Sequence, residues 1–275
     1  MMTGNKSCRW AFHVNSWTPI ESEWLLASTC VQKEEKEKIG KFVFKKDAKP
    51  SMIGRLMIRK YINDFFNIPY NHIELSRDIN GKPILDNNDN NIMFNISHQG
   101  DFVVLAGEYG NIKLGIDVMK MEYSGGKEIN DFFRIMKSNF SNEEWSTIRS
   151  SPNELNMFFR LWTLKESYVK AIGTGITIDL SKISFKIKTS TLSENCITND
   201  TALYINGKLE NNWQFQETLL DHSHCVSVAL NYHQTSYINY TFLSFNDLVD
   251  KAKPLLTKDE TYVKEFFSKP EKPTF

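Results

Sequence analysis

The stretch that most constrains this chain of 275 residues runs from Trp162 to Gly173 (WTLKESYVKAIG). Its apolar residues recur at helical spacing, and a glycine follows them where helices often end in a left-handed residue, so the stretch predicts a helix. Glu166 and Lys170 are four residues apart and therefore share one face of that helix. Such a pair is also an ordinary exposed ion pair in many helices, so a functional interpretation depends on residues elsewhere in the chain.

A second carboxylate lies inside a predicted strand. The segment from Leu114 to Val118 (LGIDV) alternates apolar residues, which indicates a strand, and Asp117 lies within it. Because aspartate is disfavoured in strands, Asp117 either faces solvent on an edge strand or is paired with a cation. Together with Glu166 it supplies oxygen ligands of the kind that Mg²⁺ prefers, and no Cys/His cluster with zinc spacing competes with them.

Two polar clusters precede Asp117 in the chain. The run from Asn95 to His98 (NISH) lies at the end of a predicted strand, where hydroxyl, imidazole and backbone N–H groups can bind phosphate. The same residue types also favour ordinary turns. The run from Arg77 to Lys82 (RDINGK) places two basic residues around an Asn-Gly turn, which by itself is typical of an exposed hairpin.

Charge is balanced over the whole chain but not along it. Thirty-three basic residues face thirty-three acidic ones, so the net charge argues neither for nor against nucleic acid or membrane, and neither partner is expected. Residues 33–60, however, hold ten basic and four acidic side chains. That excess is compatible with a solvated helix face, with a polyanionic ligand, or with an acidic protein partner.

The absence of targeting features favours a cytoplasmic protein. No stretch of about 18 apolar residues exists, and the first ten residues lack the apolar core of a signal peptide. The four cysteines are scattered without a CxxC pair, which favours free thiols in a reducing compartment.

The order of predicted elements indicates an α+β fold. In the first half we expect a helix capped by Thr18 with Glu21, a longer helix from Asp47 to Phe66, and strands at 8–17, 72–77, 82–85, 92–97, 102–107 and 113–119. In the second half we expect helices at 131–137, 141–149 and 153–172, and strands at 176–187, 202–207, 213–216 and 225–230. We therefore expect two lobes of similar kind, residues 1–120 and 121–250, followed by a weakly ordered tail at 251–275.

The order of these motifs resembles that of the large, two-lobed 4′-phosphopantetheinyl transferases. The resemblance is carried by Arg77…Gly-Lys-Pro83, Asn95-Ile-Ser-His98, Gly115-Ile-Asp117 and Trp162-x-Leu-Lys-Glu-Ser-x-x-Lys170-Ala. The animal cytosolic members are more similar still, through FVF at 42–44, RLMIRK at 55–60, FNISHQGD at 94–101 and MFxR at 157–160. The similarity is strong from Arg9 to Phe185 and continues weakly to Leu248.

The resemblance implies a pseudo-dimer of two α+β lobes with the active site in the cleft between them. Coenzyme A binds there with Mg²⁺, and a serine of an acyl or peptidyl carrier domain, such as that of fatty-acid synthase, attacks the β-phosphate. 4′-Phosphopantetheine is transferred and adenosine 3′,5′-bisphosphate leaves. Because one chain already supplies both lobes, a monomer is expected.

The resemblance also implies roles for individual residues. Asp117 and Glu166 match the metal ligands, Glu166 also matches a general base, and Lys170 matches a residue that holds a phosphate oxygen. The positions that match coenzyme A contacts are Lys38, Arg77, Gly81, Lys82, Asn95, Ser97, His98, Lys165 and Lys170.

One departure from the family pattern concerns the metal. Many bacterial relatives have Asp-x-Glu where this chain has Asp117-Val-Met119, and methionine is a poor ligand for a hard cation. Gln99 or a water molecule is expected to take the third position. The departure leaves an alternative open, a non-catalytic protein that binds coenzyme A or carriers. A generic Mg²⁺-dependent phosphotransferase is a weaker third reading, because the chain has no ATP cradle.

Overall fold

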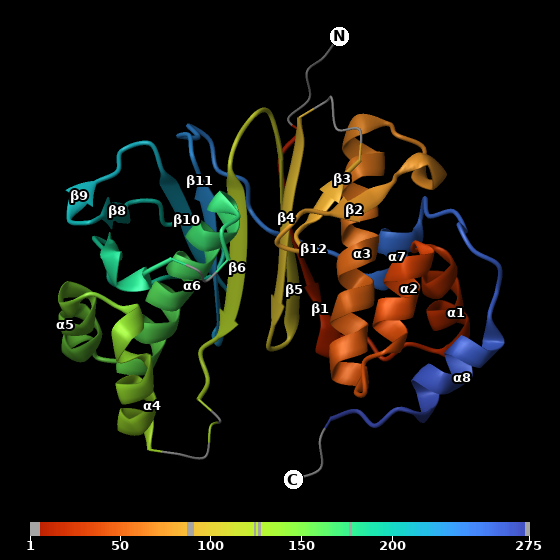
Figure 1. Cartoon of the computed structure of the whole chain (residues 1–275), viewed down its shortest axis with the longest axis horizontal. Coiled ribbons are helices and arrows are strands. Elements are labelled where there is room, and N and C mark those ends of the chain that lie inside the picture. The colour runs from red at the N-terminus through yellow and green to blue at the C-terminus, as the bar shows by residue number, and fades with distance from the viewer. Residues whose placement is uncertain (1–5, 87–90, 124, 126–127, 176–177, 273–275) are drawn as a thin grey trace.

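In the computed structural model, two sheets stand face to face at the centre and helices cover their outer faces (Figure 1). The structure describes residues 6–86, 91–123, 125, 128–175 and 178–272. The layers thus run helices, sheet, sheet, helices, and this arrangement confirms the expected α+β class. One part of the sequence prediction, the start of the strand expected at 176–187, lies outside the described residues.

The first sheet has the strand order β12-β1-β5-β4. Its strands are β1 (Cys8–His13), β4 (Ile92–Gln99), β5 (Phe102–Tyr109) and β12 (Thr241–Phe242). Its outer face is covered by α1 (Glu21–Thr29), α2 (Lys33–Gly40) and α3 (Lys45–Phe66), and a small hairpin of β2 (Leu75–Arg77) and β3 (Pro83–Leu85) lies beside them.

Local sequence explains α3 better than α1. The apolar residues of α3 recur on one face and are buried, and the helix ends at Asn67, whose φ of 54° is left-handed, two residues before Pro69. In α1 the expected Thr18 cap is wrong. The Glu23 carboxylate instead accepts a hydrogen bond from the Ile20 backbone N–H (3.2 Å), so the helix begins after the proline.

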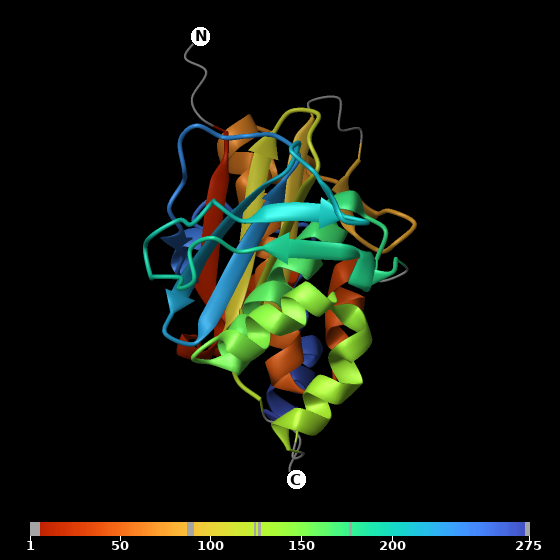
Figure 2. The same ribbon diagram turned by 90° about the vertical axis from the view of Figure 1, so that its left-hand side faces the viewer.

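The second sheet has the strand order β10-β11-β6. Its strands are β6 (Leu114–Lys120), β10 (Gln214–Asp221) and β11 (His224–Leu230). The helices α4 (Ile129–Met136), α5 (Asn142–Ser150) and α6 (Glu154–Ile172) lie on its outer side with a smaller sheet of β7 (Ile183–Lys186), β8 (Ala202–Ile205) and β9 (Lys208–Leu209) (Figure 2). A Ser141–Glu144 capping box opens α5, and the left-handed Gly173 (φ 71°) expected after α6 is confirmed.

The two sheets meet through a dedicated apolar layer. Leu114, Ile116 and Val118 on β6 face this layer, which confirms the alternation read from the sequence. The opposite face of β6 lies against α6, so closely that a side chain on Gly115 would collide with the backbone of Ser167. Asp117 shares that face and therefore points toward the helix that carries Glu166 and Lys170.

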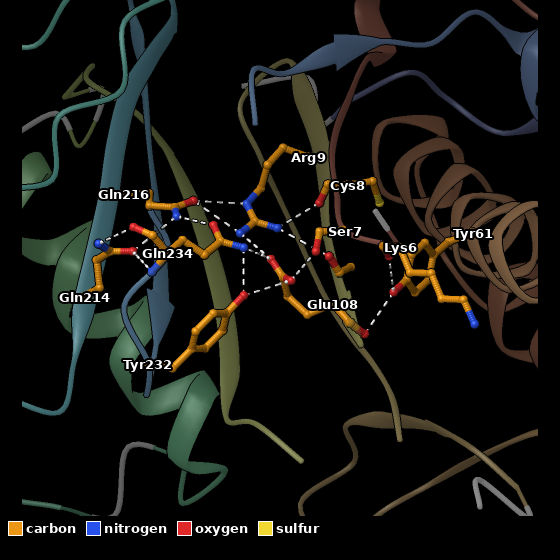
Figure 3. Close-up of polar contacts among 11 residues, drawn as sticks. Lys6, Ser7, Cys8, Arg9, Tyr61, Glu108, Gln214, Gln216, Tyr232 and Gln234 are labelled. Atoms are coloured by element: carbon orange, nitrogen blue, oxygen red, sulfur yellow. Dashed lines mark hydrogen bonds and ion pairs between the residues drawn. The ribbon is translucent and has the colours of Figure 1, made fainter. Parts of the chain in front are cut away.

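A buried polar network also crosses between the sheets (Figure 3). Arg9 of β1 and Glu108 of β5 form an ion pair of 2.6 Å with both side chains 1% exposed. The Arg9 guanidinium also donates to Gln216 of β10, while Glu108 accepts hydrogen bonds from Gln234 (3.0 Å) and Tyr232 (3.1 Å). The charged pair belongs to one lobe and its neutral partners to the other, so the network ties the lobes together.

The end of the chain returns to the first lobe, which differs from the expected division. The strand β12 pairs in parallel with β1, and α7 (Phe245–Val249) and α8 (Glu260–Ser268) join the first hydrophobic core. Phe266 of α8 stacks on Trp24 with ring centroids 3.6 Å apart. The expectation of a weakly ordered tail is therefore wrong, because Val263 and Phe266 provide a buried apolar face. The strand β6, which the expected division at residue 120 assigned to the first lobe, pairs with β11 of the second sheet.

Charged contacts hold this returning segment as well. Lys251 donates to the Asp64 carboxylate (2.8 Å), which Lys60 also contacts (2.8 Å). Lys36 of α2 pairs with Asp259 (2.8 Å), the residue that caps α8. Within the part of the chain that the structure describes, no helix is both long and apolar enough to cross a bilayer.

Candidate active site

The site lies where the edge strands of the two sheets, β4 and β6, run side by side. Side chains of β4 cross this seam and accept hydrogen bonds from backbone N–H groups of β6. The Asn95 side chain accepts from Ile116 (2.8 Å), and the Gln99 side chain accepts from Lys120 (2.5 Å). The seam thus joins the lobes while leaving space above it for a ligand.

Between these two bridges, Asp117 forms the charged centre of the site. Its Oδ1 accepts hydrogen bonds from Lys170 Nζ (2.6 Å) and from Ser97 Oγ (2.8 Å), and Lys170 also donates to Ser97 (2.8 Å). The structure therefore brings together three of the residues predicted from sequence, one each from β4, β6 and α6. The second oxygen of Asp117, Oδ2, is buried and has no hydrogen-bond partner among the described residues.

Glu166 lies one helical turn before Lys170, and both side chains line one cavity. Burial and the negative charge of Asp117 raise the pKa of Glu166, while Lys170 opposes that rise. A buried carboxylate with an unpartnered oxygen, Asp117, beside a second carboxylate, Glu166, fits a hard cation. Among the described residues, no group of three or more acidic, histidine or cysteine side chains is placed so that it could hold a metal ion by itself. The pair therefore fits a Mg²⁺ ion whose remaining ligands are water and substrate oxygens.

Three adjoining cavities form one groove along β4. The hairpin cavity, about 320 Å³, is lined by the turn at Asn80–Pro83, by Glu166 and Lys170, and by Gly173. The central cavity, about 240 Å³, is lined by Arg55, Ser97, His98 and Lys170, and it shares Pro83, Ile96 and Lys170 with the first. The third cavity, about 530 Å³, is lined in part by Glu271 and Lys272 near the end of the chain, and we call it the strap cavity. It shares Pro50 and His98 with the central one.

Two of the turn residues expected from sequence, Gly81 and Lys82, line the hairpin end of the groove, and Arg77 contacts the turn without lining the cavity. Gly81 has a φ of +83° and open space where a side chain would be, so ligand can approach its backbone closely. The Arg77 guanidinium donates to the Gly81 carbonyl (2.7 Å) and braces the turn. Lys82 reaches across to the Leu114 carbonyl (3.3 Å), and burial lowers its pKa.

His98 lies between the central and strap cavities. Burial and the positive charges of Lys170 and Arg55 lower the pKa of His98, so its imidazole is neutral at neutral pH. Arg55, on α3, is a lining residue that residue-level reasoning missed. Its sequence signals are the basic segment at residues 33–60 and the RLMIRK run at 55–60 that carries part of the family resemblance.

The turn that follows Gln99 is held by the second lobe. The Asp101 backbone N–H donates to His224 Nε2 (3.1 Å), and His224 Nδ1 lies 2.9 Å from the Asp221 carboxylate. Gly100 has a φ of +62°, and a side chain there would collide with the His224 ring. This buried histidine thus fixes the end of β4, where His98 and Gln99 lie.

Three expected site residues lie elsewhere or are otherwise engaged. Lys165 is buried against Glu144 (2.8 Å) in the second lobe, because adjacent helix positions point about 100° apart, so the expectation that it contacts phosphate is wrong. Lys38 is exposed on α2, outside the three cavities, and its role stays a prediction. The Gln99 oxygen is engaged by Lys120 N–H, and Met119 packs against the second core.

Comparisons with known proteins define the class of this two-lobed protein. Residues 15–110 match the model of the N-terminal region of 4′-phosphopantetheinyl transferases, and residues 113–229 match the model of the 4′-phosphopantetheinyl transferase superfamily. The chain therefore belongs to the 4′-phosphopantetheinyl transferase superfamily. The recognition made from the sequence motifs is confirmed.

Three relatives show which members of the superfamily this chain is similar to. The chain is 43% identical over 275 residues to the L-aminoadipate-semialdehyde dehydrogenase-phosphopantetheinyl transferase of Homo sapiens, covering 92% of this chain and 89% of the relative. The Xenopus laevis protein of the same name is 41% identical over 285 residues (97% and 94%). The phosphopantetheinyl transferase of Thraustochytrium sp. is 34% identical over 233 residues (82% and 78%).

The family match decides between the alternatives left open by the sequence. The chain is a transferase that uses coenzyme A and moves phosphopantetheine to carrier proteins. No comparison supports the non-catalytic alternative that Met119 had left open.

Proposed function

We propose that the groove transfers 4′-phosphopantetheine from coenzyme A to a serine of apo acyl or peptidyl carrier domains, that of fatty-acid synthase among them. The reaction is Mg²⁺-dependent and releases adenosine 3′,5′-bisphosphate. The observation that carries the proposal is the Lys170–Asp117–Ser97 cluster beside Glu166, at the centre of a groove that runs between two lobes.

We assign the Mg²⁺ ion to the carboxylates of Asp117 and Glu166. Asp117 and Glu166 would hold Mg²⁺, whose bound charge would neutralise the pyrophosphate and ease departure of the nucleotide. Support comes from the unpartnered Asp117 Oδ2 and from the raised pKa of Glu166. Gln99 is a weaker third ligand, because its oxygen would first have to leave the Lys120 N–H, so we assign the remaining positions to water and substrate.

The other residues bind and move protons. Lys170 donates to a phosphate oxygen and offsets the charge that develops on it. Glu166 accepts the serine proton, directly or through water. The neutral His98, with Ser97, Asn95 and Arg55, orients the phosphates.

The hairpin end of the groove takes the nucleotide. Lys82 lines that end and Arg77 braces its turn, so both bring positive charge near the ligand, and Gly81 lets its backbone approach the ligand. Lys38 would contact the cofactor only from outside the three cavities, so we assign it at most a peripheral role.

The setting of the reaction is also part of the proposal. We place the protein in the cytoplasm as a monomer. All four cysteines are free thiols, which suits a reducing compartment, and one chain supplies both lobes that the groove needs.

The first test is the intact mass of an apo acyl-carrier protein incubated with the protein and coenzyme A, with Mg²⁺ or with EDTA. We expect a gain of one phosphopantetheine with Mg²⁺ only. No gain with a panel of carriers would overturn the proposal, and a gain in EDTA would overturn the metal assignment.

A second test concerns the base. Glu166→Gln is expected to lose nearly all transfer while coenzyme A still binds by calorimetry, and Glu143→Gln on the exposed face of α5 is the matched control. Full activity of Glu166→Gln would remove Glu166 from the chemistry.

A further inference from the structure

The segment after α8, residues Lys269–Lys272, runs to the mouth of the groove, and we call it the C-terminal strap. Its start is fixed to the first lobe. The Lys269 ammonium donates to the carbonyls of Gly40 (3.0 Å) and Phe42 (2.7 Å), just after α2. Since Phe266 is also stacked on Trp24, the strap leaves a firmly packed helix.

The strap then binds the first turn of α3. The backbone N–H groups of Lys45 and Lys46 donate to the carbonyls of Pro270 (3.0 Å) and Glu271 (3.1 Å). A helix leaves the N–H groups of its first turn without partners inside the helix, so the strap satisfies two of them. The strap is therefore part of the same rigid unit that presents Pro50 and Arg55 to the groove.

Beyond these bonds, the strap lines the largest of the three cavities. Glu271 and Lys272 border the strap cavity opposite His98 and Gln99. Because His98 also lines the central cavity, a group that enters past the strap reaches the cavity that Lys170 lines. The strap cavity is therefore an entrance to the reacting centre.

The chemistry of the substrate decides what uses this entrance, and this step depends on the proposed function. Coenzyme A is a linear molecule whose reacting pyrophosphate lies between its nucleotide and its pantetheine arm. With the nucleotide at the hairpin end, the pantetheine arm and the attacking serine have to approach from the other end. A cavity of about 530 Å³ is far smaller than a carrier domain, so only the serine-bearing tip can enter.

The charge at the entrance favours an acidic visitor. Glu271 lies 3.9 Å from Lys45, which offsets its charge. The other acidic residue of the cavity, Asp47, is half-buried. Lys46 and Lys272 are exposed, and neither forms an ion pair with a carboxylate within 4.0 Å among the described residues. Two uncompensated ammonium groups at the rim attract acidic side chains and repel basic ones.

We propose that the C-terminal strap is a docking element for the carrier domain, with Lys272 and Lys46 contacting acidic residues that flank the carrier's serine. The strap thereby selects the protein substrate, and it has no part in holding the nucleotide of coenzyme A.

The test compares Lys272→Glu and Lys46→Glu with Lys264→Glu, a control on the exposed face of α8. We expect each strap-side reversal to raise the KM for an apo carrier about ten-fold at low salt, since like charges then face each other. In both reversals the KM for coenzyme A should change less than two-fold. In the Lys264→Glu control the KM for the carrier should also change less than two-fold. A chain ending at Lys269 should show the same selective rise.

A charge swap makes the test specific. A carrier whose acidic residue next to the serine is changed to lysine should be a poor substrate for the wild type and a better one for Lys272→Glu. An unchanged carrier KM in both reversals, or an equal rise in the coenzyme A KM, would overturn the proposal. An inactive wild type would instead overturn the proposed function, so the two failures are distinguishable.

Discussion

Removing one member of the buried Arg9–Glu108 pair should destabilise the protein severely. The pair is separated by 2.6 Å with both side chains 1% exposed, so Arg9→Met leaves the Glu108 charge buried without a cation. Breaking such a pair from one side costs about 3–5 kcal/mol of unfolding free energy. Glu108→Gln should cost a similar amount, because the Arg9 guanidinium would keep only neutral acceptors such as the carbonyls of Cys8 (2.9 Å) and Gly107 (3.3 Å).

The double variant tests the reasoning more sharply than either single one. In Arg9→Met/Glu108→Gln neither buried charge remains, so the loss should be about that of one single variant, and clearly less than their sum. Urea unfolding followed by tryptophan fluorescence measures all four proteins. The exposed pair of Lys182 and Asp179, 62% and 51% exposed, offers a control, and Lys182→Met should change stability by less than about 0.5 kcal/mol. Single losses below about 1 kcal/mol, or strict additivity, would refute the argument.

Three further changes probe other parts of the molecule. Lys165→Met should cost about 3–5 kcal/mol by leaving Glu144 buried without its partner, while calorimetry of the folded protein shows unchanged coenzyme A affinity; a selective loss of that affinity would restore Lys165 to the site. Gly100→Ala should lower stability by about 2 kcal/mol in thermal melts, because its φ of +62° and the His224 ring leave no room for a methyl group; an unchanged melt would refute the clash. Burial would raise the pKa of Asp64, but hydrogen bonds from its two lysine partners outweigh it and lower that pKa, so its stabilisation is complete above about pH 4 and is lost as pH falls through the folded pKa. Asp64→Asn should therefore cost about 1 kcal/mol at pH 7 and flatten the acid limb of stability, and an unaltered acid limb would contradict this assignment.

Local patterns were enough to predict much of the site. The face shared by Glu166 and Lys170, and the strand position of Asp117, follow from helical and strand periodicity, and the structure joins Lys170 to Asp117 at 2.6 Å. The prediction for Lys165 was wrong because its side chain leaves the helix in a different direction from that of the neighbouring Glu166. Lys165 has a structural role because it pairs with Glu144 of another helix, and local sequence patterns do not show that contact.

Long-range pairing was beyond the reach of those patterns. Nothing in the spacing of apolar residues says that two sheets pack face to face, or that β12 returns to pair with β1. The buried face of α8 was visible as Val263 and Phe266 three residues apart, but the charges and prolines around it suggested a tail. The lining role of Arg55 likewise depends on how α3 meets β4.

The return of the chain end to the first lobe has a consequence for biosynthesis. Domains generally fold as the ribosome releases them, the N-terminal part first. Here the first lobe lacks its edge strand β12 and the Phe266 cover over Trp24 until residues 241–266 have been made. The nascent first half is therefore expected to wait, with an unpaired strand edge and an uncovered tryptophan, until the second half has emerged. A premature stop before α8 would therefore compromise the first lobe, although that lobe is synthesised first.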